Sequence, residues 1–155
     1  MRFYHFTSSS HFRLIRASGE LNKGSLLQSN GSISENFVWL TTDPNPDRQG
    51  LDNFRSESFV EKAQIRIELF IDESDENLIS FVNFCSKNEP PLFDRRYALG
   101  VAYDIAKLSR SQARTLMFTG DSKEKNWWLY KAPIPSSRFH SVDTASTNGY
   151  MPLKC

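Results

Sequence analysis

With 155 residues, the chain is typical of a single domain that is large enough to bury a hydrophobic core. Its 19 basic and 18 acidic residues nearly balance, which does not support broad binding to nucleic acid or to an anionic membrane but leaves room for a local patch. No apolar run approaches the ~18 residues that cross a bilayer, and no charged leader with an apolar run indicates a signal peptide.

The cysteines and histidines indicate neither a disulfide framework nor a metal site. Cys85 and Cys155 lack the spacing of either, so a reducing compartment is the default. The histidines are too scattered to predict a ligand set; they are His5, His11 and His140. We therefore expect a cytoplasmic protein with no metal bound.

The N-terminal segment predicts a strand followed by a short helix. Residues 2–6 are rich in aromatic side chains, which favours a strand. One of the serines at 8–10 can cap a helix over about 9–18, with Gly19 as its stop. The helix would turn one apolar face to the core, carrying Phe12 and Ile15.

Two more strands are expected in the middle of the chain. The turn-rich segment 19–32 predicts a surface connection, and residues 36–42 predict a strand. Two prolines end that strand and begin a long loop over 43–60. Residues 63–71 alternate apolar and polar side chains, which is the period of a strand with one buried face. The apolar members are Ile65, Ile67, Leu69 and Ile71.

Two helices are then predicted. Apolar residues at helical spacing favour a helix over 77–87 that ends at the prolines of 89–91. They are Leu78, Phe81, Val82 and Cys85. A second amphipathic helix is predicted over 94–109, whereas residues 114–120 fit a strand or a helix end equally well.

The C-terminal segment predicts strands again. Residues 126–135 begin as a strand that ends at their prolines, and residues 138–142 fit one more strand. The last dozen residues are expected to be frayed. The order of elements indicates an α+β fold with helices packed on antiparallel sheet. We expect one domain over 1–140 and a tail over 141–155.

His5 is the first candidate functional residue, because four hydroxyl residues follow it within the aromatic run. A neutral imidazole offers one hydrogen-bond donor and one acceptor. On a strand that faces a cleft, it can therefore form a hydrogen bond with a sugar hydroxyl. Thr7 and the serines after it add short-range donors. The commoner fate of these residue types is a half-buried strand histidine beside a helix cap.

Tryptophans supply the other candidates. Trp39 lies on the strand before the loop and can stack on a flat heterocycle or pack in the core. Thr41, next along that strand, fits a ligand contact or simple turn chemistry. Trp127 and Trp128 are adjacent on a strand, so they point to opposite faces and cannot share one core.

Several catalytic motifs are absent from the sequence. It has no glycine-rich phosphate loop, no His-Glu-x-x-His and no Gly-x-Ser-x-Gly. Cys85 fits a helix core better than a nucleophile, and no two carboxylates form a catalytic pair by their spacing alone.

The opening "YHFTSSSHFRLIRASGEL" and the later "WWLYKAPIPSSRF" resemble ADP-ribosyltransferase-like domains, in particular DNA ADP-ribosyltransferase toxins and RNA 2′-phosphotransferases. Together with "VWLTTDP", these segments are also similar to a set of small uncharacterised proteins. The resemblance implies two small, mostly antiparallel half-sheets with flanking helices around a cleft. It further implies that NAD lies in that cleft as the substrate.

The same resemblance implies roles for individual residues. His5 would bind a ribose hydroxyl, Thr7 and Ser8 would assist it, and Trp39 would be an aromatic wall. Thr41 is a further cofactor-binding candidate. His5 and Trp39 are then expected to line one concave wall. Breaking the glycosidic bond builds an oxocarbenium-like sugar, so a carboxylate is needed nearby.

The carboxylate is where this chain departs from the family pattern. Asn126 stands where the family places its catalytic Glu, and Glu124 can serve only if the strand begins earlier. Three alternatives follow: the protein binds without turnover, it uses Glu124 or Asp43, or it runs phosphotransferase-like chemistry with basic residues. Those basic residues would be Arg13, Arg16 and Arg48.

Two functions follow. The first is NAD-dependent transfer of ADP-ribose to a macromolecular acceptor, either a protein or a nucleic acid. The second is an inactive module on the same fold, which binds a nucleotide or a partner protein that it inhibits.

Overall fold

The computed structural model describes residues 1–27, 33–46, 62–87 and 123–153. Several predicted features lie outside these residues. They are the helix over 94–109, the segment 114–120, Arg48 and most of the loop 43–60. The described part is a mixed fold with mostly antiparallel sheet, which confirms the coarse α+β prediction. Among the described helices, none is long and apolar enough to cross a membrane.

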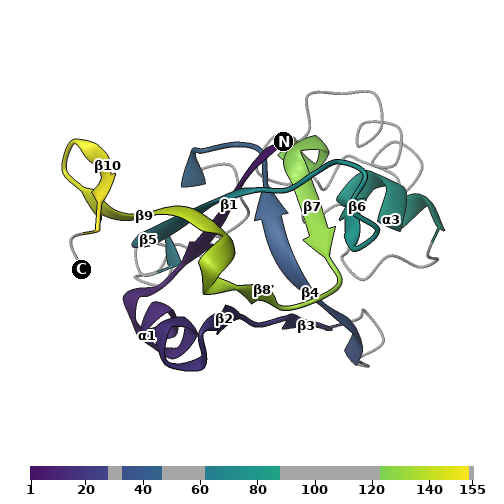
Figure 1. The fold of residues 1–155 in the computed structure, drawn as a ribbon. Coiled ribbons are helices and arrows are strands. Elements are labelled where there is room, and N and C mark those ends of the chain that lie inside the picture. The colour runs from purple at the N-terminus through teal and green to yellow at the C-terminus, as the bar shows by residue number, and fades with distance from the viewer. Residues whose placement is uncertain (28–32, 47–61, 88–122, 154–155) are drawn as a thin grey trace.

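One large sheet and one small sheet organise the described residues (Figure 1). The order in the large sheet is β10-β9-β5-β1-β4-β7-β6, and β3 also pairs with β4. Its strands are β1 (Arg2–Thr7), β3 (Gly24–Leu27), β4 (Ile33–Thr41), β5 (Ile65–Phe70), β6 (Leu78–Ser80), β7 (Trp127–Tyr130), β9 (Phe139–Ser146) and β10 (Gly149–Pro152). The small sheet pairs β2 (Glu20–Leu21) with β8 (Ile134–Pro135).

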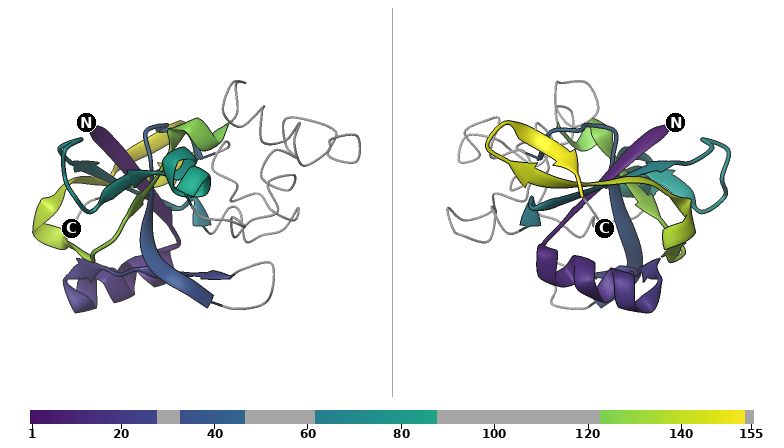
Figure 2. Two further views of the ribbon diagram at one scale, coloured as in Figure 1. Left: turned by 90° about the vertical axis from the view of Figure 1, so that its right-hand side faces the viewer. Right: turned by 60° about the vertical axis from the view of Figure 1, so that its left-hand side comes forward.

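Short helical elements flank the sheets. They are α1 (Ser9–Ser18), α3 (Phe81–Lys87) and the 3-10 turns η3 (Lys123–Asn126) and η4 (Ser136–Arg138). Figure 2 shows α1 beneath the large sheet, and α3 on the side away from the β9–β10 hairpin. The large sheet is thus covered by different elements at its two ends.

The large sheet divides between β1 and β4. β1 pairs with β5 along its whole length, from Arg2–Phe70 to Thr7–Ile65, but with β4 only at Tyr4–Thr41. In Figure 1 the two strands meet near the start of β1 and diverge toward α1. We call this divergence the fork; it separates a β10-β9-β5-β1 half-sheet from a β4-β7-β6 half-sheet.

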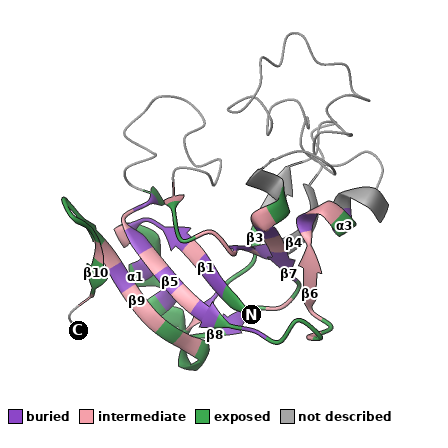
Figure 3. Cartoon of the chain, turned by 90° about the horizontal axis from the view of Figure 1, so that it is seen from above, coloured by how far each residue is buried: buried purple, intermediate pink, exposed green. Residues whose placement is uncertain are grey.

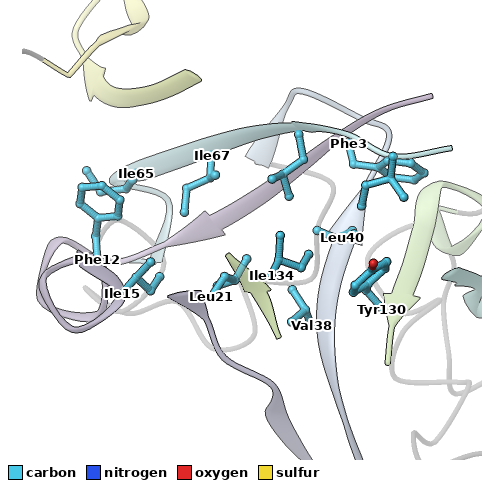
Figure 4. Close-up of a cluster of buried hydrophobic side chains, with 12 residues drawn as sticks. Phe3, Phe12, Ile15, Leu21, Val38, Leu40, Ile65, Ile67, Tyr130 and Ile134 are labelled. Atoms are coloured by element: carbon cyan, nitrogen blue, oxygen red, sulfur yellow. The ribbon is translucent and has the colours of Figure 1, made fainter. Parts of the chain in front are cut away.

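The main core fills the space between the diverging half-sheets (Figure 4). The β1–β5 side contributes Phe3, Ile65, Ile67 and Leu69; the β4–β7 side contributes Val38, Leu40 and Tyr130; and α1, β2 and β8 close the space with Phe12, Ile15, Leu21 and Ile134. Figure 3 shows the alternation of buried and intermediate residues along β5 that the sequence predicted. Burial of this apolar surface is the main driving force for closing the fork with α1 and the small sheet.

A second cluster lies on the opposite face of β4 and β7, against α3. It consists of Phe37, Phe81, Phe84, Trp127 and Leu129, with Trp39 and Ile79 packed beside it. Trp127 belongs to this cluster, whereas Trp128 packs against the main core and meets Phe3 edge to face. The prediction that the two tryptophans point to opposite faces is confirmed.

The first helix begins and ends where its sequence predicted. Ser8 is the N-cap, since its hydroxyl accepts from the N–H of His11. Gly19 ends the helix at φ 77°, and its N–H donates to the carbonyl of Ile15. A left-handed residue at this position favours glycine because a Cβ would strain the backbone.

Three sequence predictions about secondary structure were wrong. The connection 19–32 contains β2 and β3, and Leu78–Ser80 is the strand β6 rather than the first turn of a helix. The residues expected to fray continue β9 and form β10. These two strands pair from Ser146 with Gly149 to Asp143 with Pro152. β2 and β6 pair with the distant strands β8 and β7, whereas β3 and β10 pair with the neighbouring strands β4 and β9. All four are two to four residues long, which is too short for local periodicity to reveal them.

Candidate functional site

His5 lies at the fork and joins the two half-sheets. It is half-buried, and its Nδ1 lies 2.8 Å from the carbonyl oxygen of Trp39. The backbone of β1 pairs with β4 at Tyr4, immediately before His5. The imidazole therefore satisfies a β4 carbonyl at the point where the backbone ladder between the strands stops.

The environment of His5 keeps the imidazole neutral. Burial is the largest effect and lowers the pKa of His5; the Trp39 carbonyl opposes it, and the nearby His11 adds to the lowering. A carbonyl only accepts, so Nδ1 carries the ring proton and Nε2 presents a lone pair. Among the described residues we find no hydrogen bond to Nε2.

Trp39 does not share a wall with His5, so that expectation is wrong. The Tyr4–Thr41 pair sets the register, and it places His5 on the face of Leu40. Leu40 belongs to the main core, whereas Trp39 packs on the opposite face with Phe81 and Trp127. Only the backbone carbonyl of Trp39 reaches the imidazole.

Thr7 and Ser8, the residues expected to assist His5, have different surroundings. Thr7 is buried on the same face of β1 as His5, and within the described ranges its hydroxyl makes no side-chain hydrogen bond. The hydroxyl of Ser8 accepts the capping hydrogen bond from the N–H of His11. It also lies 2.9 Å from Ser10 Oγ and 3.1 Å from His11 Nδ1. Of the two, only Ser8 has a hydroxyl that is engaged by neighbouring side chains within the described residues.

Thr41 and Asn126 lie at the paired ends of β4 and β7. Thr41 is buried and its Oγ1 accepts from the N–H of Asp43, which is the turn chemistry considered for it. The carbonyl of Asn126 accepts from the N–H of Thr42 at 2.9 Å, and the hydroxyl of Thr42 donates to Asn126 Oδ1. Asn126 therefore holds two chain segments together.

Asn126 is the last residue of η3, and β7 begins at the next residue. Glu124 belongs to the same 3-10 turn, so the strand does not begin early enough to include it. The side chain of Glu124 lies outside the described residues. By register, Tyr4 pairs with Thr41, and Thr41 pairs with Trp127. The start of β7 is thus two strand spacings, about 10 Å, from β1 beside His5.

The charged groups around His5 differ from what phosphoryl chemistry needs. Within the described part of the chain, no carboxylate or guanidinium contributes to the pKa shift of His5. Arg13 and Arg16 are both exposed on α1. Among the described residues, no group of His, Cys, Asp and Glu could hold a metal ion.

A cluster that the sequence analysis missed lies on the other face of the β1–β5–β9 half-sheet. Arg66 makes an ion pair with the buried Asp143 at 2.9 Å and donates to the carbonyl of Pro44 at 3.3 Å. Its guanidinium lies 4.4 Å from the ring centre of Tyr150 and 5.4 Å from that of Tyr4. Asp143 and Tyr150 fell within the expected tail, so the sequence offered no signal for this cluster.

No protein-family model, curated protein or solved structure matches this chain. The geometry of the fork and the resemblance in the sequence are therefore the grounds for a functional proposal.

Proposed function

We propose that this chain is an ADP-ribosyltransferase-like domain that binds an NAD-type dinucleotide against the exposed part of His5, outside the core that fills the fork, with His5 holding a ribose hydroxyl. The observation that carries the proposal is the His5–Trp39 bond, which leaves Nε2 of a half-buried imidazole as an acceptor without a described partner. The two half-sheets that diverge at this residue support it as well.

The charges favour binding without turnover. Loss of nicotinamide develops positive charge on the ribose, which a nearby carboxylate would stabilise. Asn126 carries no charge and is engaged with Thr42. Among the described residues, His11 supplies the one charge effect on the pKa of His5. The domain would then act by holding a nucleotide or by inhibiting a protein partner.

A second candidate is NAD-dependent transfer of ADP-ribose to a protein or nucleic acid. It is favoured by the place of Glu124 in the turn directly before β7, two strands from β1. In this case Glu124 would oppose the developing cation, and His5 would orient the ribose. NAD is then the substrate rather than a retained ligand.

Calorimetry with NAD and ADP-ribose, beside a label-transfer assay with radiolabelled NAD and cell lysate, tests both candidates. We expect saturable binding that His5→Ala abolishes or weakens by about tenfold, which is what the loss of one hydrogen bond costs. Binding without nicotinamide release supports the inactive module.

Release or transfer that Glu124→Gln abolishes supports the enzyme instead. Glu73→Gln is the matched control because Glu73 is exposed in the turn after β5. If the wild-type protein neither binds NAD or ADP-ribose nor releases nicotinamide, both candidates are wrong.

A further inference from the structure

The outer face of α1 carries the most exposed large hydrophobic side chain among the described residues. Leu14 is 65% exposed, whereas no other described side chain of this kind exceeds 50%. Phe12 and Ile15 bury the opposite face of the helix in the main core beneath the large sheet (Figure 2). Apart from these two, every residue of the helix from Ser10 onward is exposed. The face that carries Leu14 is therefore open to a partner.

Two arginines flank Leu14 without an acidic partner. Arg13 and Arg16 are exposed, and neither makes an ion pair or a side-chain hydrogen bond with the rest of the described chain. α1 itself contains no Asp or Glu. The other arginines within the described ranges are all paired, namely Arg2 with Glu68, Arg66 with Asp143 and Arg138 with Asp75.

The spacing of the two arginines suits a carboxylate from outside the helix. Residues three apart are neighbours on a helix surface, so the side chains of Arg13 and Arg16 leave α1 one turn apart. Like charges at such spacings repel, and an anion between them relieves the repulsion. A guanidinium can bind a carboxylate through two parallel hydrogen bonds, which fixes its orientation as well.

We propose that the outer face of α1 docks against a protein partner that presents an apolar pocket bordered by carboxylates. Leu14 fills the pocket, and Arg13 and Arg16 pair with the carboxylates. This is the mode in which one face of a helix lies in the groove of a partner and is anchored by residues three or four apart. The inference goes beyond the proposed function, because it does not depend on a bound nucleotide.

A protein fits this face better than the other possible occupants do. A phosphate backbone offers no apolar pocket to an exposed leucine. Anionic membranes are typically held by clusters of about four to eight basic residues, whereas α1 has two arginines. A second copy of the chain, placed by a twofold axis on the same face, would bring the unpaired arginines of both copies together, and they would repel.

Two synthetic helical peptides serve as probes for the full chain. Both carry glutamates along one face; the first has leucines beside them, and the second has glutamine in place of each leucine. Fluorescence anisotropy of the labelled peptides at low salt measures binding. We expect the first peptide to bind saturably and the second about tenfold more weakly, as expected when a leucine loses its burial.

Three variants connect this binding to α1. Leu14→Gln should bind the two peptides equally, and the double variant Arg13→Gln, Arg16→Gln should bind the first peptide roughly fivefold more weakly. Glutamine is a good helix former, so these variants should melt like the wild type. Lys125→Gln is the matched control, because Lys125 is exposed on η3 and should leave the binding unchanged.

The other occupants are tested with the same variants. The probes are a single-stranded oligonucleotide and vesicles that contain phosphatidylserine, and sedimentation of the protein alone tests a second copy. Tighter binding to the oligonucleotide or the vesicles than to the first peptide, or self-association that Leu14→Gln abolishes, would overturn the proposal. It also fails if the wild type binds both peptides equally or neither of them. None of these outcomes bears on nucleotide binding, which calorimetry with NAD tests separately.

Discussion

Replacing Asp143 by asparagine tests whether the Arg66 cluster anchors the C-terminal hairpin to the sheet. Asp143 is 7% exposed, and its Oδ2 accepts from both Nε and Nη2 of Arg66. Tyr150 of β10 covers the guanidinium, and Pro44 after β4 accepts from Nη1. Asp143→Asn keeps the shape of the side chain but leaves the guanidinium without its counter-charge.

The magnitude follows from the burial of the pair. Opposite unit charges about 4 Å apart attract by about 4 kcal/mol at an effective dielectric constant of ~20. The side chains of Arg66 and Asp143 are 20% and 10% exposed, so solvent screens them weakly. The remaining bond to Pro44 and the two rings recover part of the loss. We therefore expect the free energy of unfolding to fall by about 2–4 kcal/mol.

Urea unfolding followed by tryptophan fluorescence measures this change, with thermal unfolding as a second probe. A loss of ~3 kcal/mol corresponds to a melting temperature lowered by roughly 6–12 °C for a chain of this size. Arg2→Met is the control, because Arg2 pairs with Glu68 from a side chain that is 58% exposed and should leave the urea midpoint unchanged. A loss below about 1 kcal/mol for Asp143→Asn would mean that the pair behaves as a solvated surface bridge, and the reasoning would be refuted.

Three further predictions concern local features. Ser8→Ala should lower the free energy of unfolding by about 0.5–2 kcal/mol through loss of the α1 cap, and an unchanged urea midpoint would contradict the capping role. Gly19→Ala should lower the free energy of unfolding by about 1–2 kcal/mol through its φ of 77° alone, because an added Cβ meets nothing within 4 Å. Thermal unfolding measures this change, and unchanged stability would argue against the left-handed cap. The pKa of Asp75 is lowered chiefly by the backbone N–H of Asn77, with help from the hydroxyl of Tyr130. The Asp75 carboxylate therefore contributes its full stabilisation above the ordinary pKa of 3.8. This stabilisation is lost as the pH falls through the lower pKa of the folded state. Acid titrations followed by circular dichroism should therefore show a smaller loss of stability below about pH 4 for Asp75→Asn than for the wild type, and parallel profiles would contradict this.

The local elements of this protein could be predicted from the sequence because their signals lie within a few residues. Alternation along residues 63–71 predicted β5 and its buried face. The serines predicted the start of α1, and Gly19 predicted the residue at which it ends. The adjacency of Trp127 and Trp128 in the sequence was enough to place them on opposite faces of the sheet. Each of these depends on backbone period or on a cap, which operates without knowledge of the rest of the chain.

The arrangement at His5 was decided by tertiary structure. The sequence singled out the histidine by its neighbours, but whether Trp39 faces it depends on the register of β1 against β4, and shifting a register by one residue exchanges the faces. The same holds for the C-terminal hairpin, whose residues gain their order from the pairing of β9 with β5 and from Arg66, nearly eighty residues earlier. Neighbouring residues determine elements such as α1 and β5, whereas contacts between distant segments determine which side chains meet. A functional site depends on such contacts.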